Sequence, residues 1–126
     1  SNCFFRSATN MQLAWQKCQG DVWGTLMDVD LSHAHFNNME GLYIIWQGNG
    51  PVVRVGQGII RDRLAIHRGD TAITAYPNLY VTWAPVSALY RDGIERYLAN
   101  VLKPKVGDAF PNVTPTQVFL PWPWQM

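Results

Sequence analysis

The sequence predicts a small α/β domain of the α+β kind, in which helices flank a three-stranded antiparallel sheet. Three observations predict this fold. Residues 42–55 contain two short apolar runs on either side of a Gly-Asn-Gly-Pro turn, which is a strong β-hairpin signal. A helical pattern follows at residues 59–67. Residues 79–83 then have the composition of a third strand, and a second helical pattern begins near Asp92.

The predicted hairpin determines which side chains share a face of the sheet. With a two-residue turn at either 48–49 or 49–50, Tyr43 shares a face with Arg54 and Gly56. A three-residue loop would exchange the faces, because successive side chains of a strand alternate. We therefore expect one side of the hairpin to carry a phenol beside a guanidinium. The other side is expected to face the core with Leu42, Ile44, Trp46, Val53 and Val55.

The helix predicted at residues 59–67 carries two basic side chains on one side, Arg63 and His67, because they are four positions apart. Ile60 and Ile66 are three positions from Arg63, so Arg63 lies on or beside the buried stripe. A cation in that position needs a partner. The sequence leaves two partners open, an acidic neighbour of a snorkelling arginine or an anionic ligand.

The second predicted helix brings a carboxylate toward buried surface. Glu95 shares a side of this helix with Leu98 and Leu102. A carboxylate that loses its water is costly unless a cation meets it. That cation could be an arginine, Arg63 in particular, or a divalent metal ion.

Residues 1–40 are expected to form an extension that packs on the domain. A short helix is predicted within residues 9–20, with Thr9 or Asn10 at its start and Gly20 at its end. An acidic loop follows, and it contains four residues of metal-binding types, Asp28, Asp30, His33 and His35. They suit either a metal site or a solvated loop, and we favour the loop because no hydrophobic shell is apparent around them.

Composition indicates one globular domain, since 48% of residues are apolar and 15% are charged. No apolar run reaches membrane-spanning length, so no membrane partner is expected. Cys3 and Cys18 are expected to be reduced thiols in a cytoplasmic protein. The formal net charge is only +1, but four arginines fall between residues 54 and 68, where they would create a local positive potential for phosphate groups.

Residues 108–126 form a Pro/Trp-rich tail of the same domain that ends in LPWPWQM. We expect its tryptophans to pack against the edge of the core. A contact patch for another protein and a stacking platform for unpaired bases are the alternatives.

Between residues 41 and 107 the chain contains an ordered set of motifs. They are the triplets GLY (41–43) and RVG (54–56), Arg63 with His67, and Glu95 ahead of a Leu-Lys-Pro sequence. This order resembles the GIY-YIG nuclease superfamily. Two positions depart from its pattern: Arg54 stands where the family usually has tyrosine, and Gly107 where it usually has a polar residue, often asparagine.

The resemblance implies that residues 41–107 are the catalytic core of a metal-dependent endonuclease, a hydrolase that cuts phosphodiester bonds of nucleic acid, with DNA as the expected partner. It implies one divalent ion, Mg²⁺ or Mn²⁺, held by Glu95. Tyr43 would act on the attacking water, and Arg63 would bind the scissile phosphate. The implied catalytic residues are Tyr43, Arg54, Arg63, His67 and Glu95, and the residues expected to bind nucleic acid are Arg54, Gln57, Arg61 and Arg68.

The two departures keep two alternatives open, a nucleic-acid-binding domain of this type that does not cleave and a protein-interaction module. The specificity for a target could reside in other domains or in a partner chain.

Overall fold

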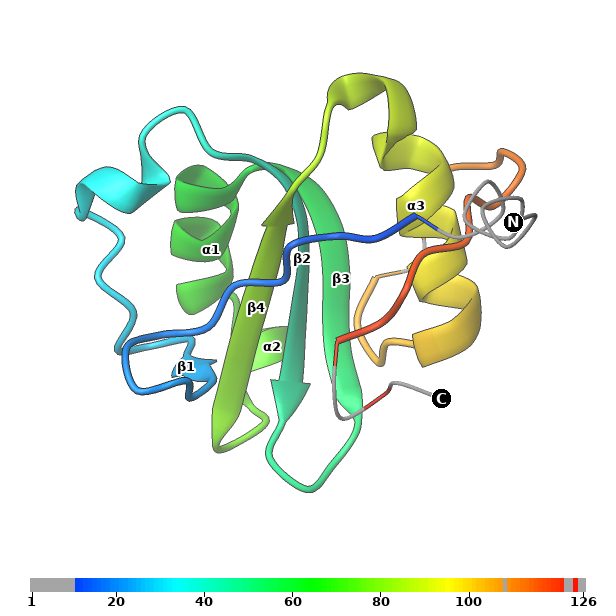
Figure 1. The fold of residues 1–126 in the computed structure, drawn as a ribbon. Helices are drawn as coiled ribbons and strands as arrows, with labels where there is room; N and C mark the ends of the chain where they lie inside the picture. Colours follow the sequence, from blue (N-terminus) through cyan, green and yellow to red (C-terminus); the bar gives the residue numbers. More distant parts are fainter. Residues whose placement is uncertain (1–10, 108, 122–123, 125–126) are drawn as a thin grey trace.

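The computed structural model describes residues 11–107, 109–121 and 124, which form a four-stranded antiparallel sheet with helices on both faces (Figure 1). The strand order is β1-β4-β2-β3, so β3 lies at one edge. In chain order the elements are β1 (Gly24–Thr25), the 3-10 helix η2 (Ala34–Phe36), β2 (Glu40–Gln47), β3 (Val52–Ile59), α1 (Ile60–Arg68), α2 (Thr71–Thr74), β4 (Leu79–Pro85) and α3 (Ala88–Leu102).

The predicted α+β class is confirmed, with differences in detail. The three predicted strands are β2, β3 and β4, and the two-residue β1 adds a fourth strand beside β4. Helix α3 begins at Ala88, one turn before Asp92, where the sequence predicted its start. Within the described residues, no helix has the length and apolar character needed to cross a bilayer.

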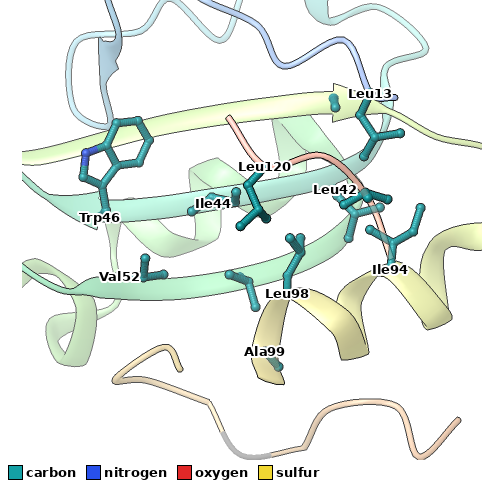
Figure 2. Close-up of a cluster of buried hydrophobic side chains, with 12 residues drawn as sticks. Leu13, Leu42, Ile44, Trp46, Val52, Ile94, Leu98, Ala99 and Leu120 are labelled. Atoms are coloured by element: carbon teal, nitrogen blue, oxygen red, sulfur yellow. The ribbon is translucent and has the colours of Figure 1, made fainter. Parts of the chain in front are cut away.

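The sheet separates two hydrophobic clusters, because alternate residues of β2 point to opposite faces. Leu42 and Ile44 lie in the cluster on the α3 side (Figure 2), whereas Tyr43 and Ile45 lie in the cluster on the α1 side. Both faces are therefore core-facing, whereas the sequence predicted only one. The helices contribute Ile94 and Leu98 from α3, and Ile60 and Leu64 from α1.

The β2–β3 hairpin reaches one of its two predicted registers by a different route. Its loop has three residues, 48–50, because the amide of Gln47 donates to the carbonyl of Pro51. A β-bulge at Val53 adds one more residue to β3, which restores the register so that Tyr43 pairs with Gly56. The prediction that Tyr43, Arg54 and Gly56 share a face is confirmed. The prediction for Val53 is wrong, because the bulge turns its side chain to the α1 side.

The helix predicted within residues 9–20 is wrong over the described residues 11–20, which are extended; residues 9 and 10 lie outside the described part. Met11 bridges Val118, and the amide of Gln16 donates to the carbonyl of Trp83. Leu13 is buried while the residues on either side of it are exposed, so the segment has the alternation of a strand.

Gly41 is the first residue of the GLY triplet, and the packing of β2 against β4 explains why it is glycine. A Cβ at this position would overlap the backbone carbonyl oxygen of Ala84 in β4. The obstacle is backbone within a paired strand, so it cannot move aside as a flexible side chain would.

We expect Gly41→Ala to lower the free energy of unfolding by about 2 kcal/mol or more, since the new methyl group forces β2 and β4 apart. Urea denaturation measures this change. Gly69→Ala is the matched control, because the nearest atom to its Cβ would be 3.7 Å away, and it should change stability by less than about 0.5 kcal/mol. Equal stability of the two variants would contradict the explanation.

Candidate active site

The predicted site residues surround the middle of β3, the edge strand. Residues 54, 56 and 58 of β3 point to the α1 side, and Gln57 points to the α3 side. The segment after α3 covers only one end of the strand edge, where the amides of Lys105 and Val106 donate to the carbonyls of residues 52 and 53. Among the described residues no strand pairs with the outer side of β3, so groups from both faces can meet at its edge.

Tyr43 and His67 form a buried pair on the α1 side. The Tyr43 hydroxyl oxygen lies 2.5 Å from Nε2 of His67, and the two residues are 0% and 3% exposed. Gly56 lies beneath the phenol, and a Cβ there would overlap the hydroxyl group. The other ring nitrogen of His67, Nδ1, is buried without a hydrogen-bond partner. Glycine at position 56 therefore makes the space that lets Tyr43 reach across β3 to α1.

Burial holds His67 in its neutral form. Desolvation lowers its pKa from the ordinary 6.5 to about 4, and the positive charges of Arg54 and Arg63 act in the same direction, while Asp70 opposes them. A neutral imidazole can accept a proton from a neighbouring hydroxyl group, which an imidazolium cannot do.

Arg54 and Arg63 differ from the other described arginines in having no hydrogen-bonded partner. Arg61, Arg68, Arg91 and Arg96 all donate to carbonyl, amide or carboxylate oxygens. Arg54 and Arg63 donate to none of the described residues, and Nε of each is buried without a partner. A partly buried guanidinium without an acceptor is unfavourable unless a ligand supplies one.

Glycines accommodate both of these arginines. The aliphatic arm of Arg63 lies over Gly58, where a Cβ would stand 3.3 Å from its Cγ and Cδ. The guanidinium of Arg54 lies against Gly107, where a Cβ would overlap Nη1. The two positions that depart from the GIY-YIG pattern, 54 and 107, are thus in contact with each other.

Glu95 of α3 approaches the same strand from the other face. It is 8% exposed, and its Oε1 accepts a hydrogen bond of 2.8 Å from the side-chain amide of Gln57. The same Gln57 nitrogen donates to Asp92 at 2.7 Å, so one amide group links the two carboxylates. Burial raises the pKa of Glu95, and the bond from Gln57 and the charges of Arg54 and Arg63 work against this rise, while Asp92 adds to it.

The two arginines connect the faces of the sheet electrostatically, because each lowers the pKa of both His67 and Glu95. The structure thus brings together all five predicted catalytic residues around the Gly56–Gln57 segment. The ion pair between Glu95 and Arg63 that the sequence allowed is not present among the described residues, where the ion pairs are Lys17 with Asp21 and Arg91 with Glu40.

Two residues predicted to bind nucleic acid have structural contacts instead. Arg61 donates to the carbonyls of Leu31 and His33 and to the side chain of Asn37, and Arg68 donates to the carbonyls of Leu26 and Val29. Both arginines thereby fasten the loop before β2 to α1. Gln57, the third such residue, is engaged by Asp92 and Glu95.

The acidic loop contains no metal centre among the described residues, where no group of three His, Cys, Asp or Glu side chains lies close enough to hold an ion. Each of its four candidate ligands instead accepts a local hydrogen bond. The donors are Thr25 to Asp28, Ser32 to Asp30, the His35 amide to His33, and Trp83 to His35.

In the tail, Trp124 packs edge-on against Trp46 with ring centres 4.8 Å apart, and Trp122 lies outside the described residues. This contact agrees with the packing role predicted for the tail.

The donor set at Glu95 fits an ion that takes most of its ligands from water and substrate. Oε1 is held by Gln57, and Oε2 has no partner among the described residues yet is not fully buried, so solvent can reach it. A single carboxylate of this kind suits Mg²⁺ or Mn²⁺, which keep several waters, and does not suit an ion enclosed by protein ligands.

No family model, curated protein or solved structure matches the chain. The likeness to GIY-YIG nucleases therefore stands on the residues described above.

Sequence reasoning missed two contacts of the site. It gave Asp92 only a capping role, although its position three residues before Glu95 places both carboxylates on one side of α3. It also treated Arg54 and Gly107 as separate departures. Their contact depends on how the segment after α3 returns to β3, which no local pattern reveals.

We expect the pH dependence of stability to reveal His67. Its pKa is lower in the folded chain than the ordinary 6.5, so its contribution is complete above pH 6.5 and is lost as the pH falls toward about 4. Compared with His67→Gln, the parent chain should lose up to about 3 kcal/mol of stability across this window. Urea denaturation of both chains at several pH values measures the difference, and parallel curves would contradict it.

Proposed function

We propose that this chain is a metal-dependent endonuclease that hydrolyses phosphodiester bonds of nucleic acid, with DNA as its substrate, by single-metal chemistry of the GIY-YIG type. The observation that carries the proposal is the gathering of five groups around one edge strand. A buried Tyr43–His67 pair, two arginines without protein acceptors and a carboxylate held by an amide all lie beside the Gly56–Gln57 segment.

Phosphodiester hydrolysis requires charge stabilisation at the phosphoryl group, and the site offers it in two forms. Arg63 would bind the scissile phosphate through its planar fork, which matches two phosphate oxygens at once. Glu95 would hold the divalent ion through Oε2 while Gln57 fixes Oε1. A bound Mg²⁺ or Mn²⁺ would act as a Lewis acid on the phosphate oxygens.

The Tyr43–His67 pair would remove the proton of the attacking water. The phenol oxygen would take that proton as its own proton passes to Nε2 of His67, 2.5 Å away. The low pKa of His67 keeps the imidazole neutral and ready to accept at neutral pH. The orphaned Nδ1 keeps the ring free of any other described hydrogen-bond partner.

The burial of Tyr43 sets a condition on this mechanism. Because Tyr43 is 0% exposed, substrate binding must open a path for one water to its hydroxyl group. The same observation favours a second candidate function, a nucleic-acid-binding domain that uses the arginines without cleaving. Cleavage separates the two candidates.

We expect the chain to nick supercoiled plasmid in the presence of Mg²⁺ or Mn²⁺ and to lose this activity in a chelator. Glu95→Gln keeps an acceptor for Gln57 but removes the charge that holds the ion, and Arg63→Gln removes the fork that holds the phosphate. Each should reduce nicking about 100-fold or more. Gel electrophoresis of the plasmid forms over time measures the rates.

Lys105→Gln is the matched control, because it removes one exposed positive charge near β3 and keeps the backbone bond to Val52, and its rate should stay within about twofold of the parent. Nicking that survives both site substitutions overturns the proposal. A band shift without cleavage supports the binding domain, and neither shift nor cleavage leaves the protein-interaction module.

A further inference from the structure

The site holds positive charge beyond what one phosphate-binding arginine accounts for. Arg54 and Arg63 are partly buried, each has a buried Nε without a partner, and neither meets an acceptor among the described residues. Their terminal nitrogens are absent from the set of buried atoms without partners, so solvent reaches them. Two cations that lack protein acceptors and remain accessible define a place for an anion.

The chain makes room for both guanidiniums at some cost to backbone regularity. Gly58 has a φ of +132° and Gly107 a φ of +98°, and both lie directly against the arginine side chains. Because Gly107 bears no side chain, the guanidinium of Arg54 can occupy the space where a Cβ would be. Arg54 is therefore fitted into the structure and is not a chance surface residue.

We infer that Arg54 and Arg63 together form a two-arginine site for a tetrahedral phosphate group, that this site binds without metal, and that Gly107 positions Arg54 for it. The inference deepens the proposed function, on which its biological ligand rests, because it gives the substrate phosphate a second cationic contact at the position of the second signature triplet. A phosphodiester and a free phosphate present the same oxygens, so the shared chemistry is a phosphoryl group.

The orphaned Nε–H groups provide the experiment. The full chain, labelled with ¹⁵N and kept in a chelator, is titrated with inorganic phosphate and separately with a dinucleoside phosphodiester, and the arginine Nε–H signals are followed by NMR. The signals of Arg54 and Arg63 should move with one common dissociation constant. Those of Arg61 and Arg68 should stay fixed, because their Nε–H groups already donate to Leu31 and Leu26.

Arg54→Gln and Arg63→Gln should each weaken phosphate binding about tenfold or more, since a hydrogen bond to a charged group is lost. Lys105→Gln, which changes the net charge equally, should weaken it less than about twofold. Gly107→Ala should weaken binding in the parent by displacing Arg54 and should add nothing in the Arg54→Gln background. Melting temperatures recorded beside each titration show that the variants are folded.

Equal movement of all four arginine signals, an unchanged affinity in Arg54→Gln, or additive effects of Gly107→Ala and Arg54→Gln would each overturn the inference. Binding of free phosphate but not of the dinucleoside phosphodiester supports the two-arginine site and argues against a nucleic-acid ligand. Because no metal is present in these titrations, phosphate binding without nicking keeps the site and rejects the nuclease. Nicking without phosphate binding does the reverse.

Discussion

The pairing of Tyr43 with Gly56 is the contact on which the arrangement of the site depends. A buried tyrosine ring can cross β3 only where that strand carries no side chain, and Gly56 provides the crossing point. From there the hydroxyl group reaches His67, which joins β2 to α1 through a polar contact inside an otherwise apolar cluster. Because a buried polar group without a partner is costly, this contact also fixes how α1 lies against the sheet.

The edge position of β3 gives the site access to both faces of the sheet. A central strand would separate a group on the α1 side from one on the α3 side by a full layer of side chains. At the edge, Arg54 and Arg63 influence His67 on one face and Glu95 on the other. The segment after α3 covers the end of this edge near the bulge and leaves the stretch beside Gly56 without a pairing strand in the described part.

Local patterns were sufficient for the parts of the fold built from local contacts. The alternation in the hairpin predicted that Tyr43, Arg54 and Gly56 share a face, and the helix that carries Arg63 and His67 was predicted to within about a residue at each end. Long-range contacts escaped prediction. Residues 11–16 contain enough apolar residues for a helix, but hydrogen bonds to Trp83 and Phe119 keep them extended. Arg61 was counted as a nucleic-acid contact because the sequence could not show that the carbonyl of Leu31 would meet it.

The bulge at Val53 has a consequence for how the length of this hairpin can vary in evolution. The loop and the bulge each contain one residue more than a plain two-residue hairpin in the same register needs. Losing either extra residue alone would invert the rest of β3 and turn Arg54 toward α3. Losing both would keep Tyr43 opposite Gly56, so deletions or insertions in homologous hairpins should occur in compensating pairs.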